Sequence, residues 1–188
     1  MPSPWRHKPD GQPNLQQTLA DEHHSLSWLF AVPGGDSPEL EPPQAAVQLM
    51  GSNTYEWVLD QIDGLSKPEA WSSAFGNTRV FVFTSRQLSA PKGANIGFLS
   101  GAVEDALPAI REAAGDGTVW IVGGGDLAVQ FLEAEALNEC VFTIAPVALG
   151  NGAPLFPRRL ESNQFTLTSA QQVGQFTRVA YKVTYPDR

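Results

Sequence analysis

The chain has 188 residues, of which 42% are hydrophobic, and a formal net charge of −8. This length suits one domain that buries its own hydrophobic core, and the composition excludes a wholly disordered chain. The acidic balance and the few, scattered Lys and Arg residues argue against nucleic acid as a partner. Backbone N–H groups and a single Arg can still hold a small anion.

Neither a membrane span nor a targeting segment is evident. No stretch has the length of a transmembrane helix, and the N-terminus lacks the apolar region of a signal peptide. The single cysteine, Cys140, cannot form an internal disulfide, and the adjacent His23 and His24 lack the further ligands that a zinc site needs. We therefore expect a cytoplasmic protein with no membrane partner and no bound metal.

The first 25 residues differ from the rest of the chain. They contain four prolines and no apolar run, which predicts an irregular N-terminal arm over residues 1–25, with a short helix near residues 15–21. Residues 26–188 are expected to form a single domain. Residues 26–32 are apolar and predict a short helix or a buried connector, and residues 33–43 predict a loop.

A regular pattern begins at residue 45. Short apolar runs predict strands, apolar residues at helical spacing predict helices, and two alternating segments near the C-terminus predict a hairpin with one solvated face. The expected strands are 45–50, 79–84, 96–99, 118–122 and 141–148; the helices are 53–62, 103–114 and 127–134; the hairpin is 165–168 with 176–183. Pro108 should distort one helical turn. The fold class is α/β, with a mixed, mostly parallel central sheet flanked by helices and edged by the antiparallel hairpin.

The segment Val122-Gly123-Gly124-Gly125-Asp126-Leu127 joins a predicted strand to a predicted helix. Glycines let the backbone approach a ligand closely, and a helix N-terminus offers free N–H groups with a partial positive charge. Together they suit a pyrophosphate. The spacing is not that of the Rossmann fingerprint, and the alternative is a tight turn in which Asp126 caps the helix.

Two further segments stand at the ends of predicted strands. Met50-Gly51-Ser52-Asn53-Thr54-Tyr55 repeats the strand–glycine–helix form, with a helix cap at Ser52 or Asn53 as the alternative. Phe83-Thr84-Ser85-Arg86 offers two hydroxyls and a guanidinium, which can hold a phosphate monoester or form an ordinary solvated turn. Ligands bind at the carboxyl ends of parallel strands, where all three segments are expected to meet.

These segments, in this order, resemble the dihydrofolate-reductase-like superfamily, especially the reductase domain of the bacterial riboflavin-biosynthesis deaminase/reductase and its stand-alone relatives. The resemblance covers about residues 26–185, and the run Ala145-Pro146-Val147-Ala148-Leu149-Gly150-Asn151-Gly152-Ala153-Pro154-Leu155-Phe156 is its most specific part. It implies an enzyme that uses NADPH and transfers hydride to a small pterin- or pyrimidine-like heterocycle. It also implies a homodimer.

The resemblance also implies roles for individual residues. Those expected at the cofactor phosphates are Gly51, Ser52 and Thr54. Those expected at the adenosine end are Thr84, Ser85 and Arg86. Those expected around the pyrophosphate are Val122, Gly123, Gly124, Gly125, Asp126 and Leu127. Arg86 can pair with the additional phosphate of NADPH, which favours NADPH over NADH. No catalytic acid is identified, and water can supply the proton.

The chain departs from the family pattern in two places. No counterpart of the family's first strand, which ends near S-L-D-G and borders the nicotinamide, is visible, and Val122 stands where the riboflavin-pathway reductases carry Glu. Either the strand is supplied in an unusual way, or the start of the coding sequence is displaced, or the site is incomplete. The alternatives to a reductase are therefore a non-catalytic relative that keeps the fold and a protein that binds a flavin or another nucleotide.

Overall fold

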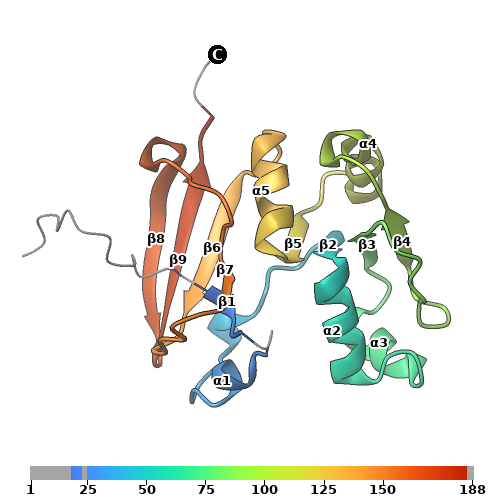
Figure 1. The fold of residues 1–188 in the computed structure, drawn as a ribbon, viewed down its shortest axis with the longest axis horizontal. Coiled ribbons are helices and arrows are strands. Elements are labelled where there is room, and N and C mark those ends of the chain that lie inside the picture. Colours follow the sequence, from blue (N-terminus) through green and yellow to red (C-terminus); the bar gives the residue numbers. More distant parts are fainter. Residues whose placement is uncertain (1–17, 23–24, 186–188) are drawn as a thin grey trace, which may run out of the picture.

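The computed structural model describes residues 18–22 and 25–185. Figure 1 shows its elements in sequence colours. In chain order they are β1 (Thr18–Ala20), α1 (Ser27–Phe30), η1 (Pro38–Leu40), β2 (Val47–Gly51), α2 (Ser52–Ile62), α3 (Pro68–Phe75), β3 (Arg79–Phe83), β4 (Ile96–Leu99), α4 (Val103–Ala114), β5 (Val119–Gly123), α5 (Gly125–Glu133), β6 (Glu139–Ile144), β7 (Ala153–Pro154), η2 (Ser162–Gln164), β8 (Phe165–Val173) and β9 (Phe176–Val183).

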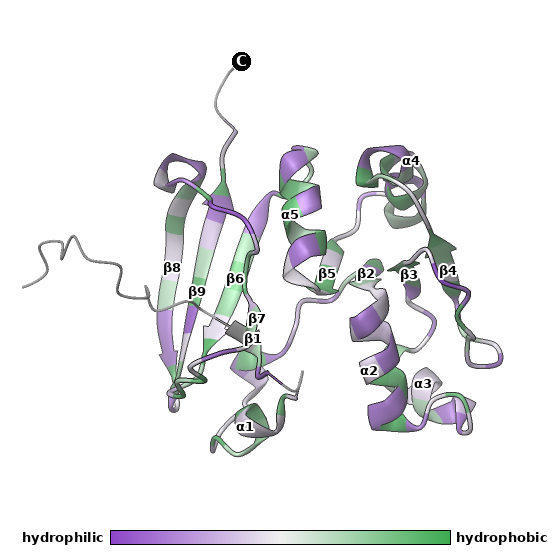
Figure 2. Cartoon of the chain, in the orientation of Figure 1, coloured by the Kyte–Doolittle hydropathy of each residue, from purple (hydrophilic) through white to green (hydrophobic). Residues whose placement is uncertain are grey.

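Four parallel strands form the central sheet, in the order β4-β3-β2-β5. Buried side chains of β2 and β3 alternate between its two faces, so each face requires a helical cover. On one face Leu49 and Phe81 pack with Ile110 of α4 and Phe131 of α5. On the other, strand residues pack with α2 and α3, where Trp71 is buried. The α/β architecture is therefore confirmed, and the hydrophilic sides of α2 and α4 face outward (Figure 2).

The antiparallel strands form a sheet of their own, in the order β6-β9-β8. The alternating segments build the expected hairpin, which turns at Gly174 with φ of 58°. Instead of edging the parallel sheet, the hairpin pairs with β6. Helix α5 connects the two sheets, because Phe131 packs into the core of the first and Leu132 packs with Cys140 of the second. In Figure 1, α5 lies between β6 and β5.

Strands β5 and β6 each end their sheet, and no strand within residues 18–22 and 25–185 pairs with the outer edge of either. The family's first strand, which borders the nicotinamide, is expected between these two strands. The described part of the N-terminal arm instead forms β1, which pairs antiparallel with β7. The helix predicted near residues 15–21 is therefore wrong for residues 18–20, and residues 15–17 lie outside the described part of the chain.

Some local details differ from the sequence expectations. The strand predicted over residues 141–148 begins at Glu139 and ends at Ile144, followed by irregular backbone. Helix α3 was not predicted, although Pro68 at its start is a common helix signal. The helix predicted over residues 103–114 is confirmed as α4, with Pro108 inside it.

Among the described residues, none of the helices has the length and hydropathy that a membrane crossing requires.

Candidate cofactor site

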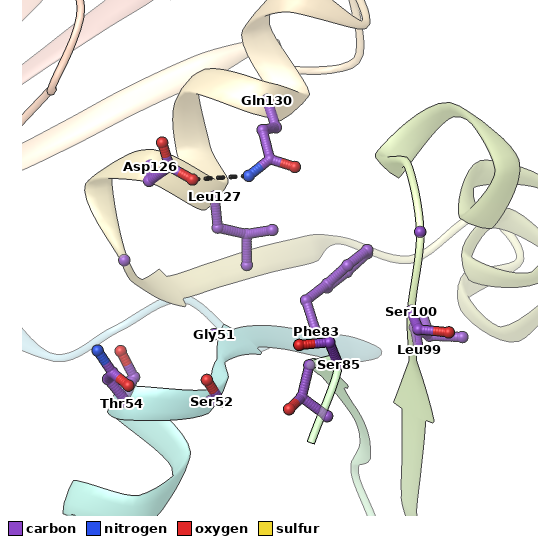
Figure 3. Close-up of a pocket in the computed structure, with 14 residues that line it drawn as sticks. Gly51, Ser52, Thr54, Phe83, Ser85, Leu99, Ser100, Asp126, Leu127 and Gln130 are labelled. Carbon is purple, nitrogen blue, oxygen red and sulfur yellow. Dashed lines mark hydrogen bonds between the residues drawn. The ribbon is translucent and has the colours of Figure 1, made fainter. Parts of the chain in front are cut away.

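A cavity of about 380 Å³ opens at the carboxyl ends of the four parallel strands. Its volume falls within the range of roughly 300–1,000 Å³ that is typical of small-molecule sites. Figure 3 shows its walls, with Leu127 projecting from α5 and Ser52 standing at the start of α2. The lining residues are Gly51, Ser52, Asn53, Thr54, Phe83, Thr84, Ser85, Leu99, Ser100, Gly101, Gly124, Asp126, Leu127 and Gln130.

The start of α2 forms one wall of the cavity. Strand β2 ends at Gly51, which is also the N-cap residue of α2, and no side chain caps the helix. The predicted cap at Ser52 or Asn53 is therefore wrong, and the first-turn N–H groups lack an intrahelical acceptor. A Cβ atom added at Gly51 would meet no atom within 4 Å. Gly51 thus leaves space beside N–H donors, as an anion cradle requires.

The glycine turn before α5 forms the opposite wall. Gly124 is the N-cap residue with φ of 90°, in the left-handed region that favours glycine. A Cβ at Gly125 would collide with the carbonyl oxygen of Leu155, and one at Gly123 would lie 3.2 Å from Thr54 Oγ1. Glycines 123 and 125 thus permit close packing of neighbouring segments, while Gly124 permits the turn itself.

Asp126 lies in the first turn of α5 and makes no capping hydrogen bond, so the alternative in which it caps the helix is wrong. Its carboxylate accepts a 2.8 Å hydrogen bond from Gln130 Nε2, and Arg158 Nη2 lies 3.6 Å from its Oδ1. Figure 3 shows the contact with Gln130. These two partners offset the negative charge that Asp126 brings to the cavity rim.

The turn after β3 forms a third wall of the cavity. Thr84 Oγ1 accepts a 2.9 Å hydrogen bond from the Arg86 backbone N–H, which fixes the turn. Thr84 and Ser85 line the cavity, whereas Arg86 does not. The Arg86 guanidinium forms a bidentate pair with Glu56, at 2.6 Å from Nη2 to Oε2 and 3.2 Å from Nη1 to Oε1.

Sequence comparison decides the family of the chain. The profile of the RibD C-terminal domain matches residues 69–178. The chain belongs to this family. Membership confirms the resemblance to riboflavin-biosynthesis reductases, and the conserved architecture extends beyond the matched span, as the structural relatives show.

Three relatives illustrate the similarity. The uncharacterized protein YwjB of Bacillus subtilis (strain 168) is 26% identical over 170 residues, covering 89% of this chain and 92% of that protein. A putative riboflavin biosynthesis protein from Shewanella sp. PV-4 superposes with a TM-score of 0.67 at 24% identity, covering 91% of this chain and 94% of that one. The third is the Thermotoga maritima diaminohydroxyphosphoribosylaminopyrimidine deaminase/5-amino-6-(5-phosphoribosylamino)uracil reductase. It superposes with a TM-score of 0.62 at 16% identity, with 89% of this chain matching 53% of the bifunctional protein.

The cavity brings together residues predicted from all three segments of this family member. The predicted residues that line it are Gly51, Ser52, Thr54, Thr84, Ser85, Gly124, Asp126 and Leu127. The predicted residues that do not line it are Arg86, Val122, Gly123 and Gly125. Val122 instead packs with the hydrophobic cluster beneath α2 and α3, since strand alternation turns its side chain to that face.

Sequence reasoning missed six lining residues: Asn53, Phe83, Leu99, Ser100, Gly101 and Gln130. Leu99, Ser100 and Gly101 stand at the end of β4. The strand was predicted, and the rule that parallel strands end at one edge of the sheet would have placed the residues that follow it here. Gln130 is one helical turn beyond Asp126, on the same side of α5.

The lining offers hydroxyl and amide groups and helix N-termini, beside the Asp126 carboxylate. None of the groups whose pKa is shifted (Tyr55, Asp63, Cys140 and Tyr185) lines the cavity. Burial raises the pKa of Tyr55 to about 12, and its hydroxyl donates to the Ser89 carbonyl oxygen at 2.7 Å. The described residues therefore suit the binding and orientation of an anionic ligand.

No group of three or more His, Cys, Asp or Glu side chains in the described part of the chain could hold a metal ion. His23 and His24 lie outside the described residues.

Proposed function

We propose that the protein is an NADPH-dependent reductase that acts on a small pterin- or pyrimidine-like heterocycle. The observation that carries the proposal is that the start of α2, the glycine turn and Thr84–Ser85 line one cavity. Membership of a reductase domain family supports the reaction class. The Thermotoga relative, of which this chain spans about half, carries such a reductase in its name.

The residues present fit a dinucleotide. The N–H groups in the first turns of α2 and α5 would hold the pyrophosphate, beside the open space at Gly51. The Thr84 and Ser85 hydroxyls would hold the adenosine end. Leu127 and Phe83 would provide apolar contact and exclude water. When bound, NADPH supplies the hydride; the chain orients it, and water supplies the proton.

Turnover tests this proposal. The intact protein should oxidise NADPH in the presence of one member of a panel of pterins and aminopyrimidines, followed by loss of dihydronicotinamide absorbance. The rate should depend on the heterocycle and on enzyme concentration. Absence of turnover across the panel, with NADPH binding demonstrated, would contradict the reductase activity.

As a second candidate function, the protein would be a non-catalytic family member that binds the nucleotide without turnover. The unpaired outer edges of β5 and β6 among the described residues favour it, since they border the region expected to form the nicotinamide site. Saturable NADPH binding without turnover would support this alternative. A flavin-binding version predicts a yellow purified protein.

The homodimer that the resemblance implies and the cytoplasmic location expected from the sequence both stay predictions. Sedimentation equilibrium and cell fractionation would measure them.

A further inference from the structure

An ion pair stands beside the cavity without lining it. Glu56 holds both terminal nitrogens of the Arg86 guanidinium, at 2.6 and 3.2 Å. Asn53 Oδ1 accepts a further hydrogen bond of 3.3 Å from Arg86 Nη2, and Asn53 is itself a lining residue. The Asn53 side chain therefore connects the Arg86 guanidinium to the cavity lining, and the guanidinium is already paired with Glu56.

Two local structures fix this arrangement. Asn53 and Glu56 are three residues apart on α2, so their side chains are neighbours on one helix face. The turn after β3 presents Arg86 to that face, because its backbone N–H is tied to Thr84 Oγ1. The pair thus joins the two segments expected at the phosphate and adenosine ends of a dinucleotide.

The charges of this pair act differently on a phosphate monoester and on a free ribose hydroxyl. The side chains of Arg86 and Glu56 are 50% and 42% exposed, so the pair contributes little to stability and can exchange partners at low cost. A phosphate monoester drawn to Arg86 would also lie near the Glu56 carboxylate, which repels it. A free ribose hydroxyl would instead donate a hydrogen bond to such a carboxylate, as in NAD-binding folds.

We propose that Glu56 sets the cofactor selectivity of this site by occupying Arg86, and so limits the preference for a nucleotide that carries a 2′-phosphate. The inference rests on the proposed function, since it assumes that a nicotinamide dinucleotide occupies the cavity. Arg86 alone would favour NADPH strongly; the Glu56–Arg86 pair moderates that preference.

Isothermal titration of NADPH and NADH into wild-type protein and the Glu56→Gln variant tests the inference. The ratio of the NADH to the NADPH dissociation constant should rise about five-fold in Glu56→Gln, the size expected from removing one unit charge near the ligand at high effective dielectric. Asp60→Asn is the matched control. It makes the same charge change one turn further along α2, where no contact with Arg86 occurs. Its ratio should equal that of the wild type.

The outcomes separate the inference from the function on which it rests. An unchanged or lowered ratio in Glu56→Gln, with both cofactors still binding, overturns the inference and leaves the proposed function standing. A merely structural role for Glu56 would weaken both cofactors equally and lower the melting temperature. Absence of saturable binding by all three proteins overturns both proposals.

Discussion

Gly51 and Gly125 both stand at the start of a helix, yet the structure gives them different tasks. Space is open around Gly51, whose backbone has the ordinary φ of −77°. Gly125 instead faces the backbone of Leu155, where a side chain would collide. One glycine keeps a cavity open and the other lets two segments pack.

This difference predicts opposite results for two alanine substitutions. Gly51→Ala should leave the free energy of unfolding within about 0.5 kcal/mol of wild type while weakening NADPH binding. Gly125→Ala should lower the free energy of unfolding by about 1–3 kcal/mol, because overpacking forces backbone shifts. Urea denaturation measures the free energy of unfolding of both variants. Equal destabilisation by the two substitutions would contradict the different roles of Gly51 and Gly125.

The burial of Cys140 makes the folding stability depend on pH. Burial, with a contribution from Glu139, raises the pKa of its thiol from 9.0 to about 11. As pH rises through this window the unfolded state releases the proton first, so folding stability present below pH 9 is lost between pH 9 and about 11.

The free energy of unfolding should therefore fall by on the order of 2 kcal/mol across this window from Cys140 alone. Denaturation curves at several pH values measure the fall. Cys140→Ala should flatten it. The same slope in the variant would show that other groups cause the loss, among them Tyr55, whose pKa is raised to about 12.

At the scale of elements, α5 both lines the cavity and connects the two sheets. Its first turn lines the cavity through Asp126 and Leu127. Phe131 then packs with the parallel sheet, and Leu132 with the antiparallel one. Movement of α5 would therefore disturb the cavity and both sheets together.

Truncation of these neighbouring side chains should loosen different sheets. Phe131→Ala and Leu132→Ala should each lower the free energy of unfolding by about 2–5 kcal/mol through the cavity left behind. Hydrogen exchange should speed up in β2 and β5 for the first and in β6 and β9 for the second. Glu133→Ala, at an exposed ion pair, is the control. Identical exchange patterns in the two core variants would contradict the separate roles.

The elements that local patterns specify were predicted from the sequence. Helix α4 and strand β3 have clear periodicity, whereas the eight-residue α3 is short and combines Trp71 with polar residues. The separation of the two sheets was not predicted, since β5 and β6 both read as apolar strands flanking a helix and strand pairing depends on distant residues. Similarly, the glycines were found locally, but the Glu56–Arg86 pair joins residues 30 positions apart.

At the scale of the whole molecule, the groups proposed to bind the dinucleotide lie at one edge of one sheet of an acidic chain. The net charge of −8 would repel a dinucleotide, so the proposed binding would depend on local donors at the starts of α2 and α5. Raising salt should therefore weaken binding less than it would for a protein that attracts phosphates through a basic surface. The dissociation constant at low and high salt measures this dependence, and a steep loss of affinity would contradict it.

The central claim is that the cavity at the carboxyl ends of β2, β3, β4 and β5 binds NADPH. The most direct measurement is titration of the intact protein with NADPH, followed by quenching of its tryptophan fluorescence, for the wild type and Gly51→Ala. We predict that NADPH quenches the wild-type fluorescence with saturable, one-site behaviour and that the variant has a larger dissociation constant. No saturable quenching at millimolar NADPH, or equal affinity in the two proteins, would contradict the claim.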